Sequence, residues 1–416
     1  MREKKMANRS IRVMLIQPPN HGGVRSLLPQ VDEDGVGIGF KPPLGLLYLA
    51  TYVTRHSSHE VKVIDAPAMG WNLADVVREA AAFRPHLVGI SAWTDFWYPA
   101  YHLGRQIKRD LPETHLVYGG PHVGIFAGET LDLPFVDSVI CGDGEWPFLC
   151  LCHLVADGRL ADGVPGLHLK SAGVSEGPSR FHVQEDLDAL PIPDRRFLPV
   201  ERYGSVLSRG RVVTTMMTSR GCPYRCTYCK LHFQRPVFRS ASSVVEEFRQ
   251  IARLGIQEVE VYDDTFTWSK TRVEEICRAL IAENIQVTWA IRDRVNQADP
   301  RLLSLLYQAG CRRVHYGVES GVDRVIQRMG KGITTGQARR AVTWAKAAGM
   351  NVLTYFMFGN LDETVDDMRR TIDFALDLDP DYAEFSITIP YPGTELYHEA
   401  QDRGLITSDY WRDYAL

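Results

Sequence analysis

Short apolar runs alternate with amphipathic stretches along the first third of the chain. The runs have strand length and occupy residues 11–16, 61–64, 87–91, 115–118 and 136–140. Between them, residues 72–83 and 100–110 repeat their apolar positions with helical spacing. Strands that alternate with helices in this way predict a parallel sheet covered on both faces. We therefore expect an α/β, doubly wound, Rossmann-like domain over residues 10–160, which ends in a helix at 146–160.

A change of composition follows this first region. Residues 161–205 are rich in glycine and proline, with a short strand pattern at 166–170. The prolines of residues 186–199 disfavour a helix there. We interpret residues 161–205 as a linker, with a domain boundary near residue 200.

The second half alternates again between strands and helices. Strands are expected at 212–218, 257–262, 286–291, 312–318, 351–358 and 382–389, and helices at 241–254, 270–284, 299–309, 322–329, 334–348 and 362–377. Gly255, Gly310 and Gly349 stand just after three of these helices, as C-terminal caps do. A complete eight-unit barrel takes about 250 residues, more than this region offers. The pattern therefore predicts a partial (β/α)6 barrel over residues 206–416, with its chemistry at the carboxyl ends of the strands.

Composition narrows the class of protein. The 416 residues contain 47 Lys and Arg against 51 Asp and Glu, a net charge of -4. That balance argues against a nucleic-acid partner, because such binding depends on neutralised phosphates. No apolar run approaches the roughly 18 residues of a membrane span, and the start of the chain lacks the features of a signal peptide. We expect a cytoplasmic protein.

Three of the eight cysteines stand close together, as Cys222, Cys226 and Cys229 in the spacing C-x3-C-x2-C. They follow the first expected barrel strand. Three thiolates on one loop can hold three irons of a four-iron cluster and leave the fourth iron open to another ligand. A zinc site completed by His232 is the alternative, and the surrounding barrel favours iron and sulfur. Adjacent basic residues are expected to offset the charge of such a cluster: Arg220, Arg225 and Lys230.

Small and polar residues stand at the carboxyl ends of the first five strands, where open α/β sheets bind ligands. Glycine allows a ligand to approach the backbone closely, and the hydroxyls of Ser and Thr can donate hydrogen bonds. Tight turns use the same residues, so the pattern alone leaves both interpretations open. A G-x-G-x-x-G string is missing, which disfavours a dinucleotide.

Taken together, these features resemble the radical S-adenosylmethionine superfamily, in the branch that carries a cobalamin-binding domain. The resemblance covers residues 10–415 and depends on the order and spacing of ten strings: PPLGLLYLATYV, LVGISAWT, VYGGPH, GDGEWPF, RGCPYRCTYC, VYDDTFT, GVESG, KGIT, FMFGNLDET and YPGTELY. It is strongest for the group of cyclase-like, hopanoid-modifying and natural-product enzymes.

The resemblance implies a [4Fe-4S] cluster on Cys222, Cys226 and Cys229 whose open iron binds S-adenosylmethionine. One-electron reduction by an external flavodoxin- or ferredoxin-type protein then breaks an S–C bond, and the resulting 5′-deoxyadenosyl radical abstracts a hydrogen from the substrate. The resemblance places further residues around S-adenosylmethionine: Tyr228 and Gly359 near adenine, Asp263, Asp264 and Thr265 near the amino group, Arg292 near the carboxylate, and Glu319 and Ser320 near the ribose. Wall packing for Tyr228 and a surface salt bridge for Arg292 are the alternatives. Residues 391–394 are expected either to line the substrate or to form a turn.

The resemblance also implies cobalamin in the first domain. Its expected contacts are Pro18, Pro19, Ser91, Thr94, Gly119, Gly120, His122 and Glu145. The D-x-H-x-x-G string that supplies a lower ligand in another class of cobalamin proteins is missing. A domain that has lost cobalamin is therefore the alternative.

The reaction expected from the resemblance is cobalamin-dependent methyl transfer to an unactivated carbon or phosphorus centre of a small or medium organic substrate. Transfer of the 3-amino-3-carboxypropyl group remains open. So do cyclisation, epimerisation and dehydration by hydrogen abstraction, and an iron–sulfur electron carrier or sensor.

Overall fold

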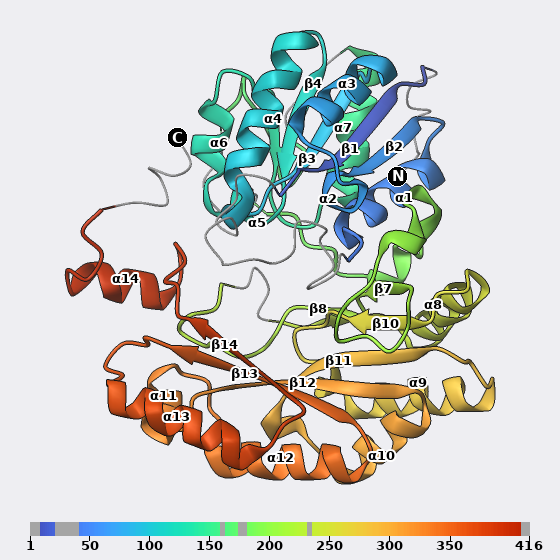
Figure 1. Ribbon diagram of the computed structural model, residues 1–416. Helices are drawn as coiled ribbons and strands as arrows, with labels where there is room; N and C mark the ends of the chain where they lie inside the picture. Colours follow the sequence, from blue (N-terminus) through green and yellow to red (C-terminus); the bar gives the residue numbers. More distant parts are fainter. Residues whose placement is uncertain (1–8, 21–40, 159–162, 174–180, 231–234, 409–416) are drawn as a thin grey trace. The chain divides into compact units, whose positions relative to one another are not determined.

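The computed structural model describes residues 9–20, 41–158, 163–173, 181–230 and 235–408. They form two compact units, each built on a six-stranded sheet (Figure 1). The first unit holds the described residues up to Glu185 together with Ala189–Leu207. The second holds Asp186–Asp188 and the described residues from Ser208 onward.

The first sheet contains five parallel strands and one antiparallel edge strand, in the order β2-β1-β3-β4-β5-β6. The strands are Arg12–Gln17 (β1), Glu60–Asp65 (β2), Leu87–Ser91 (β3), His115–Gly119 (β4), Ser138–Ile140 (β5) and Leu167–Leu169 (β6). The strand order reverses next to β1, which pairs with β2 on one side and with β3 on the other. Such a switch point is where ligands of open α/β sheets bind.

Helices cover both faces of this sheet and bury a separate apolar core on each. The helices α1 (Leu44–His56) and α7 (Glu145–Asp157) pack on one face, and α3 (Leu73–Phe83) and α4 (Trp97–Asp110) pack on the other. The shorter helices are α2 (Ala66–Met69), α5 (Pro121–Ile125) and α6 (Ala127–Asp132). Burial on both faces explains why the strands are continuous apolar runs, and the doubly wound fold is confirmed.

The segment after β6 belongs largely to the first unit. Leu198 and Tyr203 join its apolar core, and the Tyr203 hydroxyl donates to Asp65 Oδ2 at 2.9 Å. Burial raises the pKa of Asp65 to about 6, although this hydrogen bond and the N–H of Ala68 lower it. The segment contains the 3-10 turns η4 (Leu187–Ala189), η5 (Arg195–Phe197) and η6 (Val200–Arg202). Residues expected to be a plain linker therefore stabilise the first sheet.

The second sheet is entirely parallel, in the order β14-β13-β12-β11-β10-β7. The strands are Val213–Met216 (β7), Glu258–Val261 (β10), Thr288–Arg294 (β11), Cys311–Glu319 (β12), Asn351–Phe358 (β13) and Tyr382–Ile387 (β14). Ser219–Arg220 (β8) and Val237–Phe238 (β9) form a separate antiparallel pair. The sheet curls, with β7 and β14 at its two edges, so it is an open barrel (Figure 1).

Helices line the outer face of this curled sheet (Figure 1). They are α8 (Ala241–Arg253), α9 (Lys270–Ala282), α10 (Pro300–Gln308), α11 (Asp323–Arg328), α12 (Thr335–Ala347) and α13 (Val365–Leu378). A further helix, α14 (Glu395–Asp402), follows β14 and lies apart from this layer (Figure 1). Gly255, Gly310 and Gly349 have positive φ after α8, α10 and α12, which confirms these caps. The partial (β/α)6 barrel is confirmed, and α14 is an addition that the sequence pattern did not indicate.

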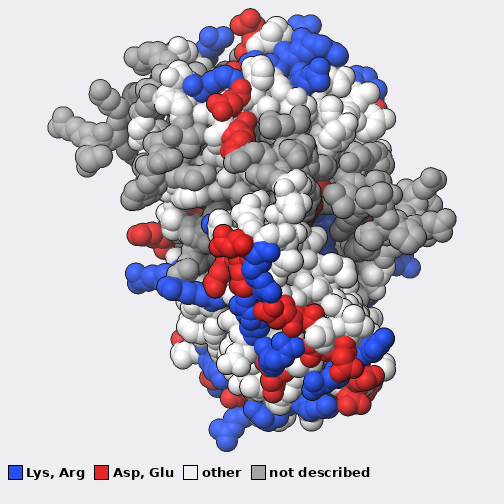
Figure 2. All heavy atoms as spheres, turned by 90° about the vertical axis from the view of Figure 1, so that its left-hand side faces the viewer, with Lys and Arg blue, Asp and Glu red and all other residues white. Residues whose placement is uncertain are grey.

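The surface around α13 and α14 carries acidic and basic side chains interleaved (Figure 2). Arg328 and Arg403 each pair with both Asp362 and Glu399.

No helix among the described residues is long and apolar enough to cross a membrane.

A buried polar network crosses the inside of the barrel. Arg313 on β12 donates to Glu258 and Glu260 on β10, at 3.2 Å each. Its Nε also donates to His315 Nε2 at 2.8 Å, and His315 Nδ1 shares a hydrogen bond with the Tyr355 hydroxyl at 2.9 Å. Breaking a buried ion pair from one side costs much more than the pair contributes, because it leaves a buried charge uncompensated.

Arg313→Met should therefore lower the free energy of unfolding by about 3–5 kcal/mol, as is typical of buried charges that lose a partner. Urea denaturation of the purified protein measures this. The matched control is Arg324→Met, which removes the half-exposed pair with Asp367 and should cost about 0–1 kcal/mol. Equal effects of the two substitutions would contradict the structural role of Arg313.

The raised pKa of Asp65 predicts a dependence of stability on pH. A carboxyl group whose pKa is about 6 in the folded state and about 3.9 in the unfolded state holds its proton more tightly when folded. Its stabilising contribution is complete below about pH 4 and is lost as the pH rises to about 6. The loss amounts to roughly 3 kcal/mol.

Asp65→Asn keeps an acceptor for Tyr203 and should flatten this pH dependence, as measured by thermal melting at a series of pH values. The control is Asp75→Asn, because the N–H of Asn72 and the Arg78 guanidinium lower the pKa of Asp75. Asp75→Asn should leave the fall in stability between pH 4 and pH 6 unchanged. A fall that persists in Asp65→Asn would contradict the assignment.

Candidate active site

The cysteine loop, residues 221–230, leaves the carboxyl end of β7 through β8. Cys222 is buried, Cys226 is half-buried and Cys229 is exposed. The charges that act on the Cys229 thiol are those of Cys226, Asp264, Cys222 and Lys331, so the three thiols are neighbours. Among the described residues, no three His, Cys, Asp or Glu side chains are grouped as ligands of a single ion. His232, the fourth ligand of the zinc alternative, lies outside the described residues.

Segments that follow the later barrel strands β12 and β14 hold this loop in place. The N–H of Thr227 donates to the carbonyl of Met329 at 3.0 Å, and the Thr227 carbonyl accepts from the N–H of Leu396 at 2.9 Å. Lys230 Nζ donates to the carbonyl of Gly393 at 3.0 Å. The loop therefore depends on residues that follow α11 and on residues that begin α14. Within residues 391–394, the Thr394 hydroxyl caps α14 by accepting from Tyr397 N at 3.1 Å, as a structural turn would.

Asp263 holds the start of the loop. It is fully buried, and its carboxylate accepts from the N–H and hydroxyl of Thr218 at 2.6 and 2.5 Å, and from those of Ser219 at 3.1 and 2.7 Å. Arg272 lies 3.8 Å away as its counter-charge. Asp263 thus ties the end of β10 to the end of β7, and these bonds occupy both of its carboxylate oxygens.

Asp264, at the same strand end, keeps part of its surface exposed. Partial burial of its carboxyl group, and then the charge of Asp263, raise the pKa of Asp264, while the N–H of Gly221 lowers it. Thr265 Oγ1 lies 3.7 Å from Cys222 Sγ. Of the three residues expected near the methionine amino group, Asp264 is the one whose carboxylate faces outward.

Glu319 ends β12 in a left-handed conformation, with φ at 70°. Its Oε1 accepts from the Tyr228 hydroxyl at 3.2 Å and from Lys331 Nζ, which also donates to the Tyr228 hydroxyl at 3.3 Å. Burial and the charges of Glu319 and Cys226 raise the pKa of Tyr228. The structure therefore brings Glu319 and Tyr228 together, as expected for one binding site. Lys331 belongs with them and was missed, although it lies in the string KGIT.

Ser320 and Gly359 differ in whether a ligand at the mouth of the barrel could reach them. The Ser320 hydroxyl is fully buried and lies 3.1 Å from Thr371 Oγ1, so it packs the strand end and does not face the mouth of the barrel. Gly359 has φ at 80°, and a Cβ built there meets nothing within 4 Å. The Gly359 backbone is therefore open to a ligand.

Arg292 lies inside the barrel, two residues before the end of β11. Its guanidinium stacks on the Tyr262 ring at 3.8 Å and lies 3.8 Å from Glu260. Arg294 points the same way, because side chains alternate along a strand, and it lies one step nearer the cysteines. Its Nη1 donates to Cys226 Sγ at 3.7 Å. Arg294 was not among the expected site residues, although its place at the end of β11 was a signal.

The carboxyl edge of the first sheet carries the expected cofactor residues. Gly120 has φ at 102°, and a Cβ there would meet the carbonyl of Ala92 at 2.7 Å, so this position requires glycine. A Cβ at Gly119 would meet only the Ile140 carbonyl, at 3.8 Å, which leaves open space over this edge. The other expected residues are half-buried or buried: Pro18, Pro19, Ser91, Thr94 and Glu145.

His122 is buried and does not present its ring to solvent. It is 1% exposed, and its ring stacks on Trp97 with centroids 4.0 Å apart. Burial lowers the pKa of His122 to about 3, so it is neutral. Two exposed aromatic residues, Trp93 after β3 and Trp146 at the start of α7, stand at the same edge and were missed. Both lie within the strings that carried the family resemblance.

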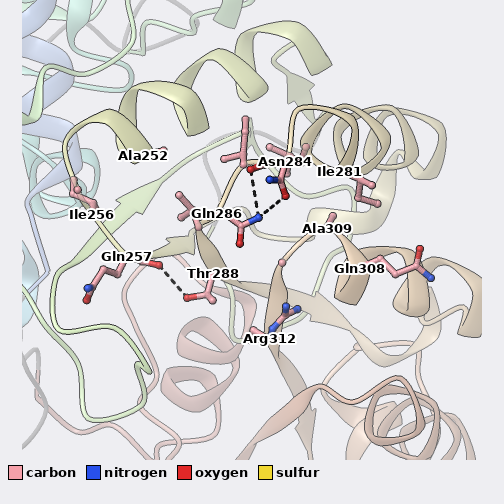
Figure 3. A pocket seen from close by; sticks show the side chains of 15 residues that line it. Ala252, Ile256, Gln257, Ile281, Asn284, Gln286, Thr288, Gln308, Ala309 and Arg312 are labelled. Carbon is pink, nitrogen blue, oxygen red and sulfur yellow. Dashed lines mark hydrogen bonds between the residues drawn. The ribbon is translucent and has the colours of Figure 1, made fainter.

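A pocket of about 360 Å³ lies at the opposite end of the barrel, at the amino ends of β10, β11 and β12 (Figure 3). Its polar groups bond to one another, since Gln286 Nε2 donates to Asn284 Oδ1 at 2.6 Å and Thr288 Oγ1 donates to the Gln257 carbonyl at 3.1 Å. None of the expected site residues lines it. Catalysis in β/α barrels takes place at the carboxyl ends, so this pocket is not the candidate site.

Comparison with known proteins agrees with both units. The family model of the radical SAM superfamily matches residues 216–375, and that of the B12 binding domain matches residues 39–150. An uncharacterized methyltransferase of Pyrococcus horikoshii is 35% identical and covers 97% of this chain and 86% of its own length. Cytidylyl-2-hydroxyethylphosphonate methyltransferase of Streptomyces wedmorensis is 28% identical, over 88% of this chain and 78% of its own.

The fold agrees with a solved structure as well. The radical S-adenosylmethionine methyltransferase TsrM of Kitasatospora setae superposes with a TM-score of 0.78 at 22% identity, over 95% of this chain and 76% of that one. The sequence relatives place the chain among enzymes of the transferase type. The chain belongs to the radical S-adenosylmethionine enzymes that carry a B12-binding domain.

Proposed function

We propose that this protein is a cobalamin-dependent radical S-adenosylmethionine methyltransferase that acts on an unactivated carbon or phosphorus centre of a small or medium organic substrate. The observation that carries the proposal is the cysteine loop, held at the mouth of the barrel beside Asp264, Glu319 and Tyr228. The methyltransferase relatives support the reaction type.

In the barrel, Cys222, Cys226 and Cys229 would hold a [4Fe-4S] cluster. Thiolates suit iron–sulfur clusters, and a loop with three of them leaves one iron open. S-adenosylmethionine would lie across the mouth, with its ribose hydroxyls at Glu319 and its adenine near Tyr228 and the open backbone of Gly359. Asp264 would accept from the methionine amino group. Asp263 positions the loop and does not touch the ligand.

In the first unit, a corrinoid would lie over the carboxyl edge of the sheet. The open space at Gly119 suits close approach of a large ring, and the half-exposed Trp93 and Trp146 offer apolar surface for it. Ser91 and Thr94 would donate hydrogen bonds to its amide groups. When bound, the cluster supplies one electron for cleavage of S-adenosylmethionine, and the corrinoid supplies a methyl carrier. An external flavodoxin- or ferredoxin-type protein would supply the electron.

Anaerobic reconstitution with iron and sulfide should give a four-iron spectrum, and Cys226→Ala should abolish it, because a loop with two thiolates cannot hold the cluster. Iron analysis together with electron paramagnetic resonance of the reduced protein measures this. Cys150→Ala, on α7, is the control and should retain the cluster. Stoichiometric zinc in place of iron in the wild-type protein would contradict the proposal.

Hydroxocobalamin should remain bound to the protein after desalting, and Gly119→Leu should weaken its binding at least tenfold, because the new side chain fills the open carboxyl edge. The visible absorption spectrum measures retention. Gly128→Leu on α6 is the matched control, since a Cβ there meets nothing within 4 Å and so the substitution is tolerated sterically, as at Gly119. Equal retention by both variants would contradict this site.

The products formed from S-adenosylmethionine distinguish the possible reactions. S-adenosylhomocysteine together with 5′-deoxyadenosine supports methyl transfer, and methylthioadenosine supports transfer of the aminocarboxypropyl group. 5′-Deoxyadenosine alone, from a protein that retains no corrinoid, supports hydrogen abstraction without methyl transfer.

A further inference from the structure

Arg294 is a buried cation that lacks an acidic partner among the described residues. It is 6% exposed, and none of the ion pairs of the described residues includes it. The neighbouring carboxyl group of Asp293 accepts hydrogen bonds from Thr267 Oγ1 and from the backbone N–H of Arg294, and no ion pair of the described residues joins it to the guanidinium. Burial raises the pKa of Asp293 to about 7, although its hydrogen bonds and the charge of Arg294 lower it. Asp293 is therefore only partly ionised at neutral pH and compensates the charge of Arg294 incompletely.

Other buried arginines of the second unit each have a carboxylate nearby. Arg313 contacts Glu258 and Glu260, and Arg239 contacts Glu247. Leaving a cation uncompensated in the protein interior is costly, so such a group is normally paired or neutralised. Arginine cannot release its proton at ordinary pH. Arg294 therefore needs a nearby anion to balance its charge.

The contacts of Arg294 point to where that anion lies. Nη1 donates to Cys226 Sγ at 3.7 Å, while Nη2 donates to the carbonyl of Lys331. The plane of the guanidinium stacks on the ring of Tyr224, 3.5 Å from its centroid, and Tyr224 belongs to the cysteine loop. The Tyr224 hydroxyl in turn accepts from Gln297 Nε2 at 2.8 Å. The guanidinium is therefore fixed in orientation with one donor aimed at a thiol of the loop.

We propose that Arg294 is the counter-cation of the cluster and raises its reduction potential, which widens the range of one-electron donors that can reduce it. This inference rests on the proposed function. A four-iron cluster with three thiolate ligands is anionic, and both its net charge and the hydrogen bonds to its sulfurs set its potential. Lys331 lies close by, but its charge is balanced by Glu319, so it adds little.

This assignment differs from the simplest sequence interpretation, in which the basic residues of the loop itself balance the cluster. Arg225 and Lys230 are exposed, and charges exposed to solvent are screened over a short distance. Arg220 is half-buried and lies on β8, before the loop begins. Arg294 is buried, so its field is screened far less. It comes from β11, about seventy residues further along the chain.

The test is a redox titration of the reconstituted full-length protein without substrate, followed by electron paramagnetic resonance. Arg294→Met should retain four irons but be at least tenfold harder to reduce at a given solution potential, a shift of about 59 mV to more negative values for one electron. Arg294→Lys keeps the charge and should stay closer to the wild-type potential. Arg249→Met removes a half-buried arginine on α8 that already pairs with Glu246 and Glu283, and should leave the potential unchanged.

Two results would overturn the proposal. One is a four-iron Arg294→Met protein with the wild-type potential, and the other is an equal shift in Arg294→Met and Arg294→Lys, which would show that shape rather than charge matters. If Arg294→Met loses the cluster while its apo form melts like the wild type, the comparison moves to Arg294→Lys, and a four-iron Arg294→Lys protein near the wild-type potential supports the counter-charge role. If the apo form of Arg294→Met unfolds, the potential of Arg294→Lys is the deciding measurement, and a value close to that of the wild type supports the role of the charge.

These outcomes are separate from failure of the proposed function. A wild-type protein that assembles no four-iron cluster, or that does not cleave S-adenosylmethionine, contradicts the proposed function itself. Unchanged potentials among proteins that do carry the cluster contradict only the role of Arg294.

Discussion

The carboxylate of Asp263 joins the first two strands of the barrel at the point where the cysteine loop begins. Four hydrogen bonds to Thr218 and Ser219 fix the chain just before Cys222, and Arg272 balances the buried charge. Bonds to a charged acceptor are among the stronger ones in proteins. Met329 and Leu396 fix the loop further along, at Thr227. The position of three cysteines close in sequence thus depends on the whole barrel, from β7 to α14.

This dependence explains which parts of the fold were predictable from the sequence. The strands and helices of both units follow from local apolar periodicity, because each element buries a face or a stripe whatever its partners are. The packing of Tyr203 against Asp65 was not predictable, since the two residues are separated by 138 positions and meet only in the folded unit. The antiparallel addition of β6 is a similar case. The strand pattern at 166–170 indicated β6 itself, but neither its antiparallel pairing with β5 nor the contact of Tyr203 with Asp65 has a local signature in the sequence.

The candidate site was predictable in position but less so in detail. Topology places the carboxyl ends of parallel strands at one edge, so the region of Asp263, Glu319 and Gly359 follows from the strand pattern. The direction and partners of each side chain do not. Asp263, Ser320 and His122 turn inward and serve the packing, whereas Asp264, Tyr228 and Trp93 remain available. Adjacent residues at a strand end point to opposite sides, and a shift of one position changes a ligand contact into a core contact.

Charge pairing distinguishes the residues that stabilise the fold from those that are available to a ligand. Inside the barrel, Glu258 and Glu260 are balanced by Arg313 and Arg292, Asp263 by Arg272, and Glu319 by Lys331. These pairs balance the buried charges without a ligand, because each charged side chain has a partner of opposite sign within the same unit. Arg294 departs from this rule among the described residues, and it does so at the thiol of Cys226. Local departures from otherwise consistent packing occur where a protein serves its function, and here the departure has the sign that an anionic cluster requires.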